Sequence, residues 1–198
     1  MGAESAEDRR KNPSVSGAGP SDGALVVAAR AGERWAQEAL FRRYARMVNG
    51  MAYRILGRAE DVDDLAQESF AQALTGLDRL ENPNAFRSWL GGIVVRQAGK
   101  MLRRRKLRQR FGLERREPLD VEAMVGASAT PEIAAELRAV YAALEKLPVE
   151  ARVALVLRRV EGLKLEEVAE RMSLSLATVK RRLKDAEDHV AKIREGEP

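Results

Sequence analysis

The chain has 198 residues, no cysteine and a single histidine, which excludes disulfide bonds, cysteine-ligated zinc and thiol catalysis. Hydrophobic residues make up 45%, enough for a packed core, and charged residues make up 33%, with a net charge of +5 and a pI near 9.7. This balance is typical of helices with ion-paired surfaces and is compatible with an anionic partner. No apolar run approaches the roughly 18 residues of a membrane helix, so no membrane insertion is expected.

Residues 1–21 differ from the rest of the chain in composition. Glycine, serine and proline recur there among charges of both signs, without a hydrophobic stretch. We therefore expect a disordered tail that contains no secretory leader.

The next block, residues 22–108, carries four apolar patterns of helical period. The expected helices cover residues 23–32, 36–55, 61–80 and 85–105. Asp22 and Asp61 are expected to cap the first and the third helix, and Gly57 is expected to end the second. The turn "ENPN" separates the last two helices, because Pro83 disfavours a helical residue before it.

Residues 109–130 lose the helical period and are expected to be a linker. The second block, residues 131–194, opens with Thr130 as an N-cap and Pro131 at the first helical position. Gly162 should end a helix, and two further helices follow, joined by the short turn "SLS". No segment alternates with the period of a strand. The expected fold class is therefore all-α, with two small helical domains joined by a linker, the C-terminal one a helix-turn-helix.

The last predicted helix combines an apolar stripe with a basic start. Leu176, Val179, Leu183 and Ala186 recur at helical spacing and should face the core, which leaves the basic residues outside. A recognition helix enters the major groove by its N-terminal part, so this face predicts contacts with DNA. An ordinary amphipathic hairpin with a charged exposed face explains the stretch alone equally well.

Two further charge clusters lie in the first block. Seven cations and no acid fall within residues 100–110, downstream of Phe86 and Trp89 in the same helix. Aromatic and basic groups together are typical of single-strand binding, although Trp89 also fits the apolar stripe of a core helix. The helix over 61–80 has an acidic, amide-rich outer face, which suits either solvent or a basic protein surface.

Three stretches together resemble the extracytoplasmic-function group of bacterial RNA polymerase sigma factors, the short two-domain group of the sigma-70 family. "DVDDLAQESF" is similar to the group's Asp-x-x-Asp-Leu-x-Gln-Glu-x-Phe signature, and "FRSWLGGIVVRQAGKMLRRR" is similar to its promoter-melting helix. "LPVEARVALVLRRVEGLKLEEVAERMSLSLATVKRRL" is similar to its −35-reading domain. The similarity covers nearly all of residues 22–193, with the three matches in the family's order.

The resemblance implies a sigma factor that binds core RNA polymerase and directs promoter recognition and −10 melting for transcription initiation. Residues 22–108 would correspond to sigma region 2 and residues 131–194 to sigma region 4. The implied contacts with core polymerase are Asp61, Asp64, Leu65, Gln67, Glu68 and Gln72. The implied −10 contacts are Asn82, Asn84, Phe86, Arg87, Trp89, Arg96, Lys100, Arg103 and Arg104. The implied −35 contacts are Ser175, Thr178, Lys180, Arg181, Arg182 and Lys184.

The resemblance also implies that the protein is not an enzyme, uses no cofactor or metal, and works in the cytoplasm. Many relatives are held by an anti-sigma factor, so such a partner is a further implication. A LuxR-type regulator that binds duplex DNA as a dimer is the alternative, but it leaves the acidic helix and the "FRSWL" helix unexplained. An enzyme is less favoured, because no glycine-rich phosphate loop, histidine pair or nucleophile–base arrangement stands out.

The chain departs from the family's pattern in four places, two of which are Arg96, where the family frequently has Asn, and Lys164, where it commonly has a capping Ser. The family usually has Tyr-Arg where this chain has Gly91 and Gly92, and glycine costs a helix about 1 kcal/mol relative to alanine. The usual basic tail after the recognition helix is replaced by Asp185, Glu187 and Asp188.

Overall fold

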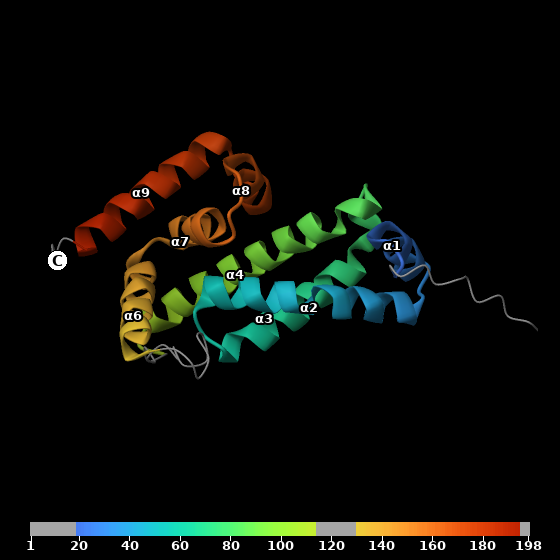
Figure 1. The fold of residues 1–198 in the computed structure, drawn as a ribbon, viewed down its shortest axis with the longest axis horizontal. Helices are drawn as coiled ribbons and strands as arrows, with labels where there is room; N and C mark the ends of the chain where they lie inside the picture. The colour runs from blue at the N-terminus through green and yellow to red at the C-terminus, as the bar shows by residue number, and fades with distance from the viewer. Residues whose placement is uncertain (1–18, 114–129, 195–198) are drawn as a thin grey trace, which may run out of the picture.

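The computed structural model describes residues 19–113 and 130–194, and within them the chain is all-α (Figure 1). The first group of helices consists of α1 (Asp22–Arg30), α2 (Arg34–Leu56), α3 (Glu60–Thr75) and α4 (Phe86–Arg110), with short 3-10 turns η1 (Leu77–Arg79) and η2 (Pro83–Ala85). The second group consists of α6 (Pro131–Lys146), α7 (Val149–Leu155) with its π-helical continuation η3 (Val156–Val160), α8 (Leu165–Met172) and α9 (Leu176–Arg194). Most of the predicted tail and linker lies outside the described residues.

Two of the predicted N-caps are wrong. The side chain of Ser21, one residue earlier than expected, accepts from the N–H of Ala24 and caps α1. Asp22 instead pairs with Arg43 through Nη1–Oδ1 at 2.6 Å, which ties α1 to α2. α3 begins one residue before Asp61, whose carboxylate therefore lies in the first turn.

Three other helix boundaries follow their local chemistry as predicted, whereas α3 ends at Thr75, five residues before its predicted end at residue 80. Gly57 and Gly162 have φ angles of 71° and 70°, in the left-handed region that glycine adopts without strain, and they follow the ends of α2 and η3. The Thr130 side chain accepts from the N–H of Ile133, and Pro131 occupies the first turn of α6. α4 runs five residues beyond its predicted end at residue 105, into the basic segment.

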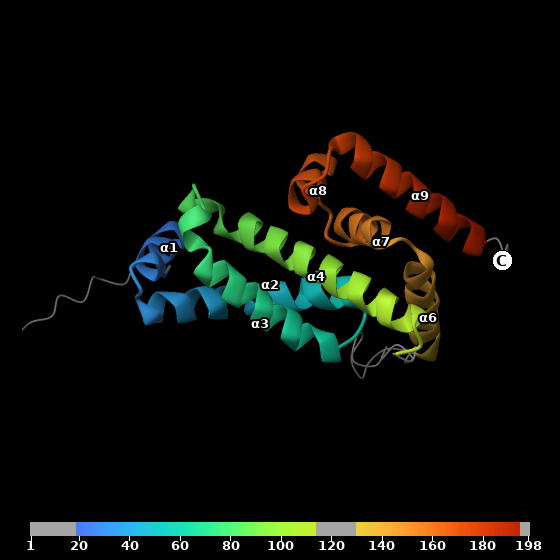
Figure 2. The same ribbon diagram turned by 180° about the vertical axis from the view of Figure 1, so that it is seen from behind.

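The core of the first domain lies between α1, α2, α3 and α4, which cross as a bundle (Figures 1 and 2). Its largest fully buried side chains include Leu25, Leu40, Ile55, Phe86 and Leu90. Burial of each such side chain contributes about 1.5–3 kcal/mol, so this core accounts for most of the domain's stability.

The second domain forms around α7, which packs against η3 and α9. Val179, Leu183 and Ala186 of α9 are buried, as their spacing predicted. α8 and α9 are joined by a turn in which Ser173 has a φ angle of 55°, and together they form the predicted helix-turn-helix.

The two domains pack against each other along α4. α7 and α8 both lie against α4 (Figure 2). The buried side chains of the two domains form one continuous hydrophobic cluster. The linker therefore joins two domains that are in direct contact, and α7 and α8 cover part of the surface of α4.

Candidate functional site

The acidic face of α3 is exposed along one side of the helix. Asp64, Gln67 and Glu68 are exposed, and within residues 19–113 and 130–194 the first two form no side-chain hydrogen bond or ion pair. Asp61 at one end lies 3.5 Å from the guanidinium of Arg105, measured from Oδ2 to Nη1. At the other end the side chain of Gln97 donates to Oε1 of Gln72 at 2.6 Å. The middle of the face is available for a partner, while its two ends are held by α4.

Two of the residues implied as contacts lie in the core instead. Leu65 is fully buried within α3, and Phe86 is fully buried at the start of α4. A side chain with no exposed surface cannot touch polymerase or DNA in this arrangement, so both are corrected to structural residues. Trp89 is half-buried and packs beside Phe86, with their ring centroids 6.1 Å apart.

The remaining implied −10 residues are exposed along α4 and the turn before it. Asn82 accepts from the N–H of Asn84 and shapes that turn. The implied cations on α4 are Arg87, Arg96, Lys100, Arg103 and Arg104, all of them exposed. Two of them are engaged: Lys100 lies 3.8 Å from Glu68, and Arg103 lies 3.2 Å from Glu150 of the second domain.

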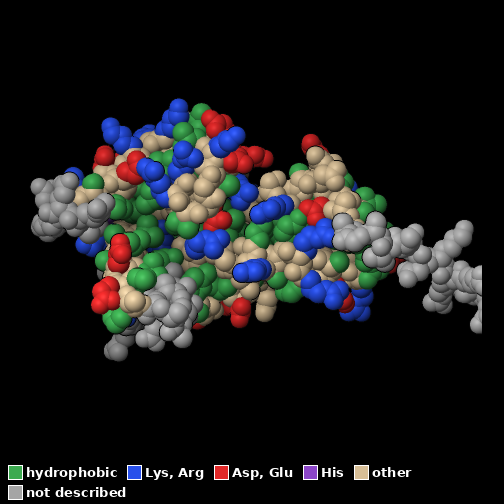
Figure 3. Space-filling model, in the orientation of Figure 1, with side chains coloured by type: hydrophobic (Ala, Val, Ile, Leu, Met, Phe, Trp, Pro, Cys, Tyr) green, Lys and Arg blue, Asp and Glu red, His purple; other side chains and the backbone are tan. Residues whose placement is uncertain are grey.

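The basic start of α9 is presented to solvent. Lys180, Arg181 and Lys184 are exposed, and Arg182 is half-buried. On the face shown in Figure 3, Lys and Arg side chains gather over α8 and α9 and recur along α4. The first turn of α9 is fixed by Ser175, whose Oγ accepts from the N–H of Thr178 at 3.2 Å. Cations held on such a face bind phosphate by releasing condensed counterions.

The acidic half of α9 has a structural role in part. Glu187 accepts two hydrogen bonds from the guanidinium of Arg159, from Nη2 at 2.6 Å and from Nε at 3.1 Å. This pair joins α9 to η3. Asp185 and Asp188 are exposed, so only one of the three acids serves the packing.

α8 covers part of the face of α4 that carries the two glycines. Gly91 and Gly92 are buried, and a β-carbon added to Gly91 would lie 2.8 Å from Nη1 of Arg171 in α8. A β-carbon on Gly92 would lie 3.9 Å from the carbonyl oxygen of Arg171. The Arg171 side chain of α8 therefore occupies the space over Gly91, and the backbone of α8 lies within van der Waals distance of a β-carbon at Gly92.

Family models match both domains. Sigma-70 region 2 matches residues 40–108, and sigma-70 region 4 matches residues 131–190. The ECF RNA polymerase sigma-E factor of Haemophilus influenzae is 33% identical over 170 residues, which is 82% of this chain and 89% of the relative. ECF RNA polymerase sigma factor SigM of Mycobacterium tuberculosis strain H37Rv is 34% identical over 173 residues, 87% of this chain and 84% of the relative. The chain belongs to the ECF sigma factors of RNA polymerase.

Two solved structures share the fold of this sigma factor. CnrH in complex with the cytosolic domain of CnrY has a TM-score of 0.60 and 24% identity, covering 89% of this chain and 99% of that one. The sigma factor RpoE of Bartonella quintana with the anti-sigma factor NepR has a TM-score of 0.59 and 18% identity, covering 80% and 96%.

As an ECF sigma factor, the protein binds core RNA polymerase and directs promoter recognition for transcription initiation. Among the described residues no helix combines the length and apolar character needed to cross a membrane. In the same part of the chain no three His, Asp or Glu side chains form a group suited to a metal ion.

Sequence reasoning missed the groups that join the two domains of this sigma factor. Arg152 of α7 is 3% exposed and donates to the carbonyl oxygens of Ile55 at 3.0 Å and Leu56 at 2.9 Å. The hydroxyl of Tyr141 in α6 donates to the carbonyl oxygen of Arg54 at 3.2 Å. All three acceptors are backbone atoms at the end of α2, so no side-chain pattern marks them. An arginine within the apolar run of α7 was the available signal, because a buried charge requires partners.

The interface perturbs the ionisation of these groups. Burial, with a smaller contribution from Arg105, lowers the pKa of Arg152 to about 10. Burial raises the pKa of the Tyr141 phenol to about 12. Burial also lowers the pKa of Lys106, and the neighbouring charge of Arg152 adds to that effect. Cations are thus concentrated where the domains meet.

Proposed function

We propose that residues 22–108 form the polymerase-binding and −10 domain of this sigma factor and that residues 131–194 form its −35 domain. The exposed acidic face of α3 supports this assignment most directly. The centre of this face carries one acid, Asp64, and one amide, Gln67, about one helical turn apart, which suits a basic protein surface. The core-binding side chains proposed are Asp61, Asp64, Gln67, Glu68 and Gln72.

The −10 strand is proposed to contact the turn before α4 and the exposed side of α4 itself. Trp89 offers a half-exposed ring on which a base can stack, and the cations downstream follow a phosphate backbone. The proposed contacts are Asn82, Asn84, Arg87, Trp89, Arg96, Lys100, Arg103 and Arg104.

The −35 duplex is proposed to receive the first two turns of α9. Ser175 and Thr178 lie at the start of the helix, where side chains reach base edges, and Lys180, Arg181, Arg182 and Lys184 follow. Asp185 and Asp188 follow these residues along α9, in the part of the helix that is proposed to lie outside the groove.

The proposed assignment is tested by mixing the purified protein with sigma-free core polymerase on a sizing column. An Asp64→Arg, Gln67→Ala variant should fail to co-elute, because it removes the free centre of the α3 face. A Glu136→Arg variant serves as the control, since it reverses an equally exposed acid on α6. Co-elution of the α3 variant at the wild-type level would contradict the assignment of the α3 face as the polymerase-binding surface.

The protein itself is proposed to carry out no covalent chemistry and to act in the cytoplasm, where its polymerase is. An anti-sigma factor is proposed as a further partner, since NepR is such a partner of RpoE. An apolar groove lined by Val140, Leu144, Val156 and Val160 supports this proposal. A Val160→Glu variant in the source bacterium should raise transcription from its promoters, while the purified variant should match wild type in vitro. No rise in the cell would contradict the groove as the docking site.

A further inference from the structure

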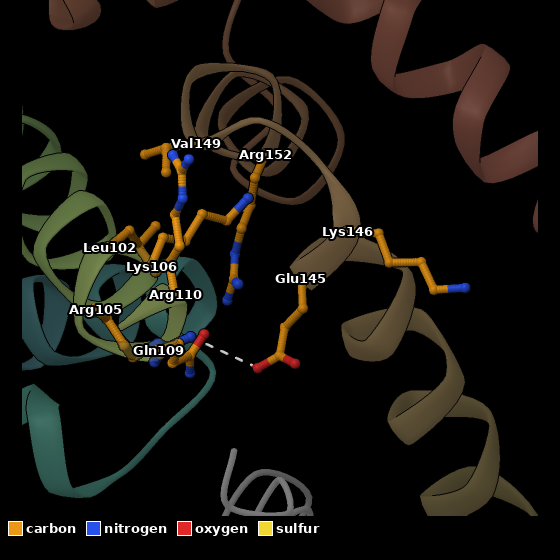
Figure 4. A pocket seen from close by; sticks show the side chains of 9 residues that line it. All are labelled: Leu102, Arg105, Lys106, Gln109, Arg110, Glu145, Lys146, Val149 and Arg152. Carbon is orange, nitrogen blue, oxygen red and sulfur yellow. Dashed lines mark ion pairs between the residues drawn. The ribbon is translucent and has the colours of Figure 1, made fainter. Parts of the chain in front are cut away.

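A cavity of about 440 Å³ lies between the two domains, bounded by the end of α4, the end of α6 and the start of α7 (Figure 4). Among the described residues that line it are five cations and one carboxylate, that of Glu145. The close view shows the ammonium group of Lys146 pointing away from the cavity. The cations left around it are Arg105, Lys106, Arg110 and Arg152.

Two of these cations, Arg152 and Lys106, donate to neutral backbone groups, and a third, Arg105, pairs with carboxylates. Arg152 is 3% exposed, and its hydrogen bonds reach two backbone carbonyl oxygens, which are neutral. Lys106 likewise donates to a backbone carbonyl oxygen, that of Leu147. Arg105 is 6% exposed and meets carboxylates at long distances, Asp61 at 3.5 Å and Glu145 at 3.6 Å. Among the described residues, the four cations of the lining outnumber the two carboxylates that pair with them, Asp61 and Glu145.

A further anion in the cavity would stabilise Arg152 most, because this buried guanidinium forms no ion pair within the described part of the chain. Buried charges are normally paired, because the interior screens repulsion poorly. Burial lowers the pKa of Arg152 and of Lys106, and a neighbouring guanidinium group lowers each of them further. Guanidinium groups also match phosphate oxygens with paired hydrogen bonds. The cavity is larger than one phosphate group and lies within the range of small-molecule sites.

We propose that this interdomain cavity binds a small molecule bearing a phosphate or diphosphate group, which Arg105, Lys106, Arg110 and Arg152 hold. The ligand would contact α4 of one domain and α7 of the other. It therefore stabilises the closed arrangement in which α8 covers Gly91 and Gly92. The inference goes beyond the proposed function, because it needs no assignment of polymerase or promoter contacts.

Titration calorimetry of the full chain with inorganic pyrophosphate tests the site, at an ionic strength held constant with sodium chloride. We expect one saturable site. A Lys106→Gln variant should bind about tenfold more weakly, the effect of losing one charged hydrogen bond. Lys146→Gln is the matched control, since it removes a charge from the same rim but not from the cavity, and its affinity should equal that of wild type.

Three outcomes would overturn the site. Wild-type protein would show no saturable heat at millimolar pyrophosphate, or the two variants would lose affinity equally, which indicates general surface attraction. In the third outcome Lys106→Gln would weaken binding to duplex DNA while leaving pyrophosphate binding unchanged, which would make Lys106 a DNA contact only.

A second measurement tests the closed arrangement itself. The natural chain lacks cysteine, so dyes can be attached at cysteines introduced at two exposed positions, Glu38→Cys in α2 and Asp188→Cys in α9. Pyrophosphate should increase the population with high energy transfer, and Lys106→Gln should reduce that increase. An unchanged or lower transfer efficiency at saturating pyrophosphate would overturn the role of the ligand in holding the domains together.

Discussion

Replacing Gly91 by tyrosine should open the closed arrangement of the two domains. A β-carbon at this position already lies 2.8 Å from Nη1 and 3.1 Å from Cζ of Arg171. The end of a flexible arginine can yield to a methyl group, but a phenol ring needs space that α8 occupies. Over-packing a tight contact costs about 1–3 kcal/mol. Since 1.4 kcal/mol changes an equilibrium tenfold, the ratio of closed to open molecules should fall by about tenfold to a hundredfold.

Gly91→Ala is the matched control for this prediction. Alanine gains about 1 kcal/mol of helix propensity over glycine and displaces only the Arg171 guanidinium. It should raise the midpoint of thermal unfolding slightly and leave the domains closed.

Energy transfer between dyes at positions 38 and 188 measures the outcome directly. Gly91→Tyr should shift the distribution to low efficiency, and Gly91→Ala should keep the wild-type distribution. In transcription with core polymerase, the tyrosine variant should need less promoter DNA for half-maximal activity, because α4 is uncovered. A tyrosine variant that keeps the wild-type energy transfer would refute the role assigned to the contact between α4 and α8.

Three further predictions concern single side chains. Leu65→Ala should lower the free energy of unfolding, measured in urea, by about 2–5 kcal/mol, because it leaves a cavity in the core. The folded fraction of this variant should still co-elute with core polymerase, and loss of co-elution would show that Leu65 is a contact after all. Arg181→Ala should weaken binding to promoter duplex and reduce the slope of log affinity against log salt by about 1, measured by fluorescence anisotropy, and an unchanged slope would exclude a phosphate contact. The raised pKa of Tyr141, about 12 in the folded protein, favours the neutral phenol, so unfolding should become easier as the pH rises from about 10 to 12. Tyr141→Phe should lose less stability than wild type across that interval in urea titrations, and equal losses would contradict the shift.

The sequence predicted features that depend on local chemistry. α8 ends at Met172, directly before the "SLS" turn that was expected to follow it. The buried stripe of α9 was also correct, since it follows from a 3.6-residue period. The caps at Asp22 and Asp61 were wrong, because an acid near a helix start can equally pair with a distant arginine.

The contacts between domains could not be predicted in the same way. Leu65 and Phe86 stand within recognisable motifs, yet their burial depends on which helices close over them. Arg152 donates to backbone carbonyl oxygens, and because every residue carries one, no residue type marks the acceptors in the sequence. From the sequence, Gly91 only lowers the helix propensity of α4. That α8 packs over this glycine cannot be read from the sequence, because no residue pattern marks the contact between the two helices.

The hydrogen bonds from α7 to the end of α2 also have a consequence for biosynthesis. The carbonyl oxygen of Ile55 finds its donor in a residue 97 positions later, and that of Leu56 finds it 96 positions later. When the first domain emerges from the ribosome, Arg152 has not yet been translated, so these oxygens are hydrated. The last turn of α2 is therefore completed only when the second domain arrives, and its amide hydrogens should exchange faster in nascent chains than in the finished protein.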